Sequence, residues 1–189
     1  MTGQSRRKTF IKIILILLVL AVLGYAGYRF LQVKKASSEA DAVIKVMYDL
    51  VPGLGTETDE SMGGGSDPLL TLSINDMDIV GCLEIPSIDL MIPVTVKSEG
   101  KNGFASVAGG SPVKGKFTIE GDRETSFYKL YKCKPDDKVI FTDIEGIRYS
   151  YRVITQYNLK DWDKAGNDLM VCYRVDEQTR FVVGCAVSE

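Results

Sequence analysis

The stretch that decides the fold is Asp168-Leu-Met-Val-Cys172-Tyr-Arg-Val-Asp-Glu-Gln-Thr-Arg180-Phe-Val-Val183, in which two apolar runs flank a short polar segment. Apolar runs around a turn-forming segment predict a β-hairpin. In an antiparallel pair, residues on either side of the turn become cross-strand neighbours, so Cys172 and Arg180 are expected close together. A thiol near a fixed positive charge ionises more readily than one in water. The hairpin is compatible with a nucleophile beside an oxyanion donor, but these residues alone favour a buried, inert cysteine in a strand with an arginine at a strand end.

A set of short motifs precedes and includes this hairpin. In chain order they are Leu83-Glu-Ile-Pro86-Ser-Ile-Asp-Leu90, Pro93-Val94, Gly121-Asp122-Arg123, Phe127-Tyr-Lys-Leu130, Leu169-Met-Val-Cys172 and Arg180-Phe-Val-Val183. This ordered set, from about Ile79 to Val187 and preceded by an apolar N-terminal segment, resembles the sortases. These are the cysteine transpeptidases that attach proteins to the Gram-positive cell surface, and the Leu-x-Ile-Pro-x-Ile strand leans away from their housekeeping class.

The resemblance implies a mostly β fold, a closed sortase-like β-barrel with short helices. It also implies that Cys172 attacks a backbone carbonyl in a sorting-signal peptide and that Arg180 stabilises the oxyanion. An amine from the cell wall or a pilin would then resolve the acyl-enzyme. The family's catalytic histidine falls on Asp122, and the chain contains no histidine. The catalytic set implied by the resemblance is therefore Cys172, Arg180 and Asp122, and it is incomplete.

Asp122 is a poor replacement for histidine. A carboxyl group with a reference pKa near 3.9 has no proton to give at neutral pH, and its charge would raise the pKa of a neighbouring thiol. Losing a positioned general acid typically costs ~10²–10⁴-fold in rate. In a simpler arrangement, Asp122 does not act as an acid but pairs with Arg180 and so occupies the oxyanion donor.

Three hypotheses follow for the function. In the first, the protein has the sortase fold but weak or lost transpeptidation, and it binds sorting signals or assists another sortase. In the second, it is an active thiol transpeptidase with acid–base help from Asp122, Tyr128 or a bound water. In the third, it is a β-barrel interaction module in which Cys172 is buried and inert. The sequence leaves open whether the protein is an enzyme.

The N-terminal region predicts a membrane anchor. Arg6, Arg7 and Lys8 precede an apolar run from Ile13 to Tyr28, which at ~1.5 Å per residue nearly spans a ~30 Å hydrocarbon core. We expect residues 10–31 to cross the bilayer, with the C-terminal domain extracellular; the alternative is a cleaved signal peptide. The expected organisation is tail and anchor at 1–35, a helical and Gly-rich stalk at 36–68, and the sortase-like barrel at 69–189.

Turn-punctuated apolar segments predict the strands of the barrel. They are Ile79–Ile85, Leu90–Val96, Lys116–Glu120, Lys138–Asp143 and Ile147–Gln156, and the last two are expected to form a hairpin around Glu145-Gly146. Phe104–Gly110 is expected to form a turn or short helix, and Thr125–Tyr131 one helical turn with Phe127 and Leu130 facing inward. A polar loop at 157–167, which carries Trp162, is the candidate for shaping a peptide groove.

Composition excludes several other classes of function. The net charge of −2 and the lack of basic clusters outside the N-terminus argue against nucleic-acid binding, and 45% hydrophobic residues allow a packed core. The four cysteines have irregular spacing without a Cys-x-x-Cys motif or any histidine, so we expect neither a metal site nor a cofactor. Cys82 and Cys185 lie in apolar strands and are expected to be buried.

Overall fold

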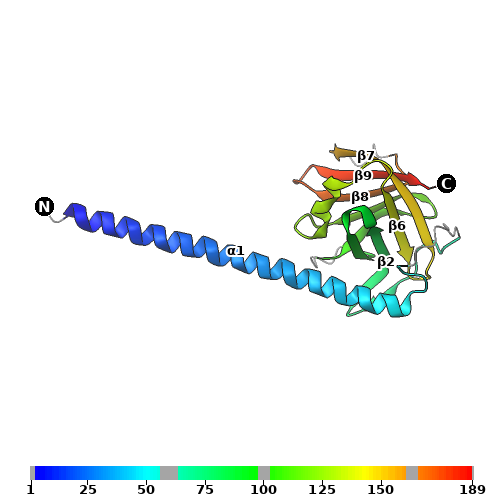
Figure 1. Cartoon of the computed structure of the whole chain (residues 1–189), viewed down its shortest axis with the longest axis horizontal. Helices are drawn as coiled ribbons and strands as arrows, with labels where there is room; N and C mark the ends of the chain where they lie inside the picture. The colour runs from blue at the N-terminus through cyan, green and yellow to red at the C-terminus, as the bar shows by residue number, and fades with distance from the viewer. Residues whose placement is uncertain (1–2, 56–63, 98–102, 161–165, 189) are drawn as a thin grey trace. The chain divides into compact units, whose positions relative to one another are not determined.

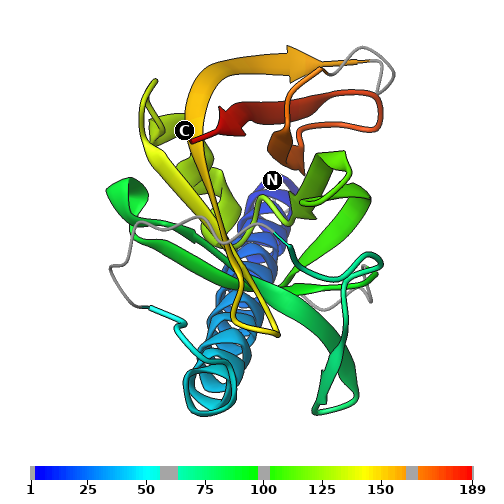
Figure 2. The same ribbon diagram turned by 90° about the vertical axis from the view of Figure 1, so that its right-hand side faces the viewer.

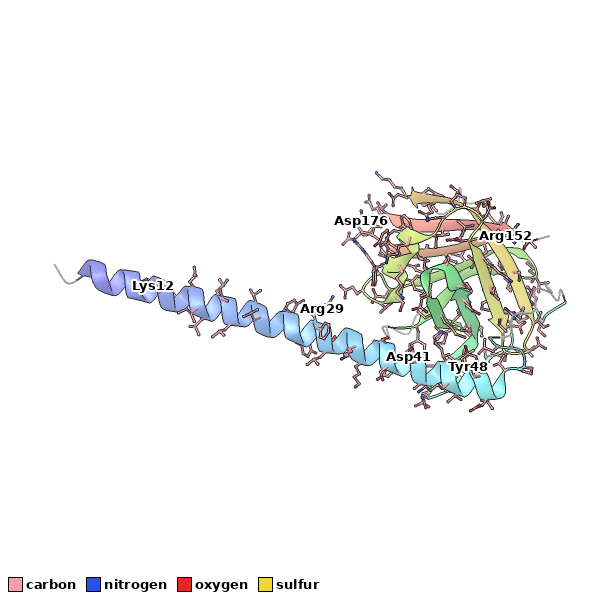
Figure 3. The ribbon with its side chains drawn as sticks, viewed as in Figure 1. Lys12, Arg29, Asp41, Tyr48, Arg152 and Asp176 are labelled. Atoms are coloured by element: carbon pink, nitrogen blue, oxygen red, sulfur yellow. The ribbon has the colours of Figure 1, made fainter. Side chains whose placement is uncertain are left out.

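The computed structural model describes residues 3–55, 64–97, 103–160 and 166–188. The chain forms two compact units, Met1–Lys35 and Ala36–Glu189. Helix α1 (Gly3–Leu50) supplies the described part of the first unit. Within the described residues, one helical segment, Ile14–Leu50, is long and apolar enough to cross a membrane. Its N-terminal apolar side chains are exposed, and the cationic side chains of Lys12 and Arg29 flank most of them (Figure 3).

In its described residues, the second unit is built on nine strands. They are β1 (Leu72–Ile74), β2 (Met77–Ile85), β3 (Leu90–Thr95), β4 (Ala105–Ser111), β5 (Gly115–Gly121), β6 (Lys138–Asp143), β7 (Arg148–Leu159), β8 (Leu169–Arg174) and β9 (Arg180–Val187). Their hydrogen-bonded order is β1-β2-β3-β4-β5-β8-β9-β7-β6, and β6 pairs back with β2. Eight strands therefore close into a barrel, and β1 extends β2 as a hairpin; Figure 1 shows β7, β9 and β8 side by side, and Figure 2 shows the strands curving around the interior.

The barrel interior is a continuous apolar core. Along each strand, alternate side chains point to opposite faces, and one face of each strand supplies the core. Two 3-10 helices, η1 (Pro86–Ile88) and η2 (Ser126–Lys132), connect strands. Phe127 and Leu130 of η2 are fully buried in this core, as the sequence predicts. The hairpins β6–β7 and β8–β9 are antiparallel, which confirms both predicted hairpins.

Two predicted segments are wrong. The sequence predicts a turn or short helix at Phe104–Gly110, but Ala105–Ser111 forms β4. Its glycines and small residues hide the strand pattern, and its pairing with β5 is interrupted by register shifts around Gly109. The loop expected from residue 157 begins later, because β7 continues to Leu159, which pairs with Arg180. Residues 161–165, including Trp162, lie outside the described residues.

The C-terminal part of α1 packs within the second unit. The side chains of Ala40, Val43 and Met47, followed by Val51 and Leu54, are buried in a second apolar cluster. Their partners there come from β1, β2 and the residue that precedes β4: Ile74, Met77, Ile79, Cys82 and Phe104. The compact unit thus begins at Ala36 and includes residues that the sequence assigned to a stalk.

Candidate functional site

The β8–β9 hairpin is held by a polar turn. One Asp176 carboxylate oxygen accepts hydrogen bonds from the backbone N–H groups of Gln178 (2.9 Å) and Thr179 (2.7 Å). The N–H of Val175 donates to the carbonyl of Thr179 at 2.8 Å and closes the loop. Asp176, labelled in Figure 3, is therefore the residue that turns the chain between Cys172 and Arg180.

Cys172 lies on the outer face of the barrel wall. Its strand neighbours Val171 and Tyr173 belong to the barrel core, so alternation directs the Cys172 side chain to the opposite face. There it forms a small apolar cluster with Met170 and Val182, packed against Tyr157 and Leu159. The residue has no exposed surface. The thiol therefore sits under its neighbours and makes no contact with solvent in this conformation.

A parallel strand brings Glu120 beside the thiol. In the β5–β8 pair, Glu120 is the register partner of Cys172, and on the other side β9 contributes Val182. The Glu120 carboxylate lies 3.5 Å from Nε of Arg180 and 3.7 Å from a terminal nitrogen of Arg174. Arg174 and Arg180 are themselves cross-strand partners. The outer face thus carries one thiol, one carboxylate and two guanidinium groups.

The electrostatics of the site keep the thiol neutral. Burial, and to a smaller extent the negative charge of Glu120, raise the pKa of Cys172, and the positive charge of Arg180 lowers it by less than either; the net value is about 12. With a pKa near 12, roughly one thiol in 10⁵ is ionised at pH 7. The arginine that the sequence predicts beside Cys172 is present, but its effect on the thiol is outweighed by burial and by Glu120.

Asp122 has a structural task at the end of β5. Its carboxylate accepts a hydrogen bond from the Glu124 N–H at 2.9 Å. Its backbone carbonyl accepts from the N–H of Thr125 at 3.2 Å and from the Thr125 hydroxyl at 2.7 Å. These bonds form the turn that leads into η2. The ion pair of Arg180 that the structure describes is made with Glu120, whereas the sequence suggested Asp122 as the partner.

Tyr157 provides a hydroxyl group close to the thiol. The residue packs on Cys172 and Met170, and its oxygen accepts a hydrogen bond from the Asn167 side-chain amide at 3.0 Å. The pKa of Tyr157 is raised overall: burial has the largest effect, the Asn167 hydrogen bond lowers the pKa by less, and the charge of Cys172 adds a smaller increase. Gly184 makes room for this arrangement, because a Cβ there would lie 2.3 Å from the Asn167 amide nitrogen. Tyr128, one of the three sources of acid–base help that the sequence left open, is exposed on η2.

Sequence reasoning missed Glu120 and Tyr157. Both lie in strands that were predicted, at least in part, but their positions beside Cys172 depend on pairings between distant strands. The only local signal was the charge of Glu120 directly after the apolar Ile119 at the end of the predicted strand. The four cysteines are free and buried, so Cys82 and Cys185 are buried as predicted, and among the described residues no group of three His, Cys, Asp or Glu side chains could hold a metal ion.

Comparisons with known proteins give the fold. No family model matches the chain, and no curated protein sequence does. Sortase C from Streptococcus pneumoniae is similar over 83% of this chain and 96% of its own, with 19% identity and a TM-score of 0.51. Sortase A from Corynebacterium diphtheriae is similar over 86% and 93%, with 16% identity and a TM-score of 0.51. Sortase C1 from Streptococcus agalactiae is similar over 62% and 72%, with 19% identity and a TM-score of 0.51. The chain therefore has the sortase fold, as the ordered motifs predict.

Proposed function

We propose that this protein is a membrane-anchored sortase-fold protein of the Gram-positive cell surface that binds sorting-signal peptides, with transpeptidation through Cys172 weak or lost. The observation that carries the proposal is the neutral, buried thiol of Cys172 in a sortase barrel. Its partners in this proposal are the sorting signals of surface or pilin proteins and, for any residual reaction, an amine from the cell wall or a pilin. Similarity to a sortase C that is described with pilin substrate specificity supports the pilin alternative.

Three features support the loss of activity. The nucleophile of a thiol acyl transfer is the thiolate, and burial together with Glu120 raises the Cys172 pKa to about 12. A peptide carbonyl must touch the sulfur to react, yet Cys172 has no exposed surface. The chain contains no histidine to protonate the departing amine. This conformation is therefore not one in which an acyl-enzyme forms.

Membrane anchoring rests on the N-terminal helix. The apolar side chains from Ile14 to Leu31 are mostly exposed, and the helix is long enough to cross a bilayer. Four basic residues precede this segment, Arg6, Arg7, Lys8 and Lys12. A short basic tail favours a cytoplasmic N-terminus, which leaves Ala36–Glu189 outside the cell.

A second candidate function is favoured by Tyr157. The phenol keeps its proton at neutral pH, because burial raises its pKa, and it packs on Cys172. If the neighbouring side chains move apart, this hydroxyl is placed to give a proton to a departing amine, the task for which the sequence left Asp122, Tyr128 and a bound water open. In that case the protein is an active thiol transpeptidase with an unusual acid.

The test uses the full chain in detergent micelles. Fluorescent sorting-signal peptides, pooled by motif, are titrated for binding, and the same mixtures are analysed by intact-mass spectrometry, with Cys172→Ala as the control. We expect saturable binding without an acyl adduct. An adduct that forms at a rate typical of a transpeptidase, and that Cys172→Ala abolishes and Tyr157→Phe slows, would establish the second candidate. Absence of binding to every peptide would overturn the sorting-signal proposal.

A further inference from the structure

We propose that Glu120 is the positioning residue of the Cys172 site: it ties Arg180 to β5 and places a negative charge beside the thiol, and so holds the site unreactive. This inference rests on the proposed function, because it explains how a sortase barrel with a cysteine and an arginine in place is kept from reacting. It assigns to Glu120, and not to Asp122, the control of the thiol.

The strand pairings place Glu120 in the centre of the site. β8 lies between β5 and β9, so Glu120, Cys172 and Val182 form one row across three strands, with their side chains on the same face. The next row on β8 and β9 is the pair Arg174 and Arg180. Glu120 reaches diagonally from its own row to both guanidinium groups, at 3.7 and 3.5 Å.

This ion pair differs from an ordinary surface pair. Exposed pairs contribute about 0–1 kcal/mol and hold neither side chain firmly. Here the Glu120 and Arg180 side chains keep only 22% and 20% of their surface exposed, while Arg174 keeps 60%. The inner pair of Glu120 and Arg180 is therefore shielded from water, and Arg174 covers it from outside. The pair thus directs the Nε side of the Arg180 guanidinium toward the Glu120 carboxylate of β5.

The charged and titratable groups that face the thiol come from each packed strand. β5 contributes Glu120, β8 contributes Arg174, β9 contributes Arg180 and β7 contributes Tyr157. Of the charges on these groups, that of Glu120 opposes thiolate formation most strongly, and the opposing effect of Arg180 is smaller. Without the Glu120 charge, the positive charge of Arg180 would favour the thiolate with nothing from β5 to oppose it.

The experiment measures the alkylation of cysteines in the full chain, in detergent micelles, with a small neutral reagent between pH 7 and 9.5. Peptide mass spectrometry gives the rate at each cysteine, and the measured quantity is the ratio of the Cys172 rate to the Cys185 rate. Cys185 is an internal reference, because it is also fully buried and its pKa is also raised to about 12, mainly by burial. Global unfolding exposes both cysteines to the same extent and leaves the ratio unchanged, so a change in the ratio reports the environment of Cys172 in the folded protein.

We expect Glu120→Gln to raise this ratio about tenfold, which corresponds to a decrease of one unit in the thiol pKa. The matched control is Asp122→Asn, which neutralises the carboxylate at the family's histidine position and should leave the ratio unchanged. An unchanged or lower ratio in Glu120→Gln overturns the inference, and so does an equal rise in Asp122→Asn.

If Glu120→Gln does not fold, Arg174→Gln gives the opposite test. It removes the outer partner of Glu120, so the carboxylate charge acts more strongly on the thiol and the ratio should fall severalfold. A ratio that stays constant or rises in this variant overturns the inference. None of these measurements uses a sorting-signal peptide as a ligand. Failure of the sorting-signal proposal is therefore seen in peptide binding, and failure of the Glu120 proposal in the alkylation ratio.

Discussion

Met47 lies near the C-terminal end of α1 and has no exposed surface. It packs with Val43 and Val51 against apolar residues from the β-strands. Truncating a fully buried methionine to alanine removes its transfer free energy and leaves a cavity, at a cost of about 2–5 kcal/mol. Since small domains unfold with about 5–15 kcal/mol, we expect Met47→Ala to remove a large part of the stability of the Ala36–Glu189 unit.

Val46 supplies a matched control, because it is the preceding residue on the same helix and is 41% exposed. Val46→Ala should change the unfolding free energy by less than about 0.5 kcal/mol. Pulse proteolysis of the full chain in detergent, across a urea series, measures both variants through survival of the C-terminal domain. Because proteolysis reports only the unfolded fraction, the anchor does not need to unfold.

The same packing predicts the behaviour of a shorter fragment. A fragment of residues 69–189 lacks five buried apolar residues of the second cluster: Ala40, Val43, Met47, Val51 and Leu54. At about 1.5–3 kcal/mol for each large side chain, their loss approaches the whole stability of a domain. We therefore expect this fragment not to fold. A cooperative urea transition in the fragment, or equal midpoints for Met47→Ala and Val46→Ala, would refute the assignment of this helix to the domain.

Three further predictions concern pH, the hairpin and the histidine position. Burial, and then the charge of Glu84, raise the Cys82 pKa from 9.0 to about 12, so the folded protein holds this proton more tightly than the unfolded chain does. The resulting contribution to folding stability is complete below pH 9 and is lost as the pH rises toward 12. Cys82→Ala should therefore flatten the decline of the urea midpoint at alkaline pH. Hydrogen bonds from Gln178 and Thr179 lower the Asp176 pKa below 3.8; Asp176→Ala should lower the urea midpoint at pH 7 more than Glu177→Ala, and this difference should vanish as the pH falls below 3.8. Asp122→His alone should produce no acyl adduct in intact-mass analysis, because the thiol stays buried beside Glu120; an adduct would show that a peptide carbonyl reaches Cys172 and would contradict the control of the thiol by Glu120.

The parts of the fold that were predicted from the sequence are those with local signals. The β6–β7 and β8–β9 hairpins follow from apolar runs around short polar turns, and their register is antiparallel as expected. The β4 strand was not predicted, because its Gly109 and Gly110 interrupt the alternation that marks a strand. The packing of residues 36–54 was also missed: helical periodicity shows which face of a helix is apolar, but not which strands cover that face.

The candidate site also contains residues that local sequence places and residues that it does not. Cys172 and Arg180 lie on one hairpin, so their proximity follows from local sequence. Glu120 reaches Cys172 only through a parallel pair, and a parallel pair joins segments that are distant in the sequence. The family's motif drew attention to Asp122, two residues further along. In a strand those two residues share a face, but Asp122 lies beyond the end of β5, where its carboxylate caps a turn.

The chemistry of the site depends on whether the carboxylate lies at position 120 or at position 122. A carboxylate in the turn at Asp122 is occupied by a backbone N–H group, whereas one at Glu120 acts directly on Arg180 and Cys172. If Asp122 alone replaced the family's histidine, the loss would be that of a proton donor, and restoring histidine would restore the reaction. In the role proposed for Glu120, one carboxylate acts on both the Cys172 thiol and Arg180. If transpeptidation is lost as proposed, we therefore expect Asp122→His to have an effect only in a variant that also changes Glu120.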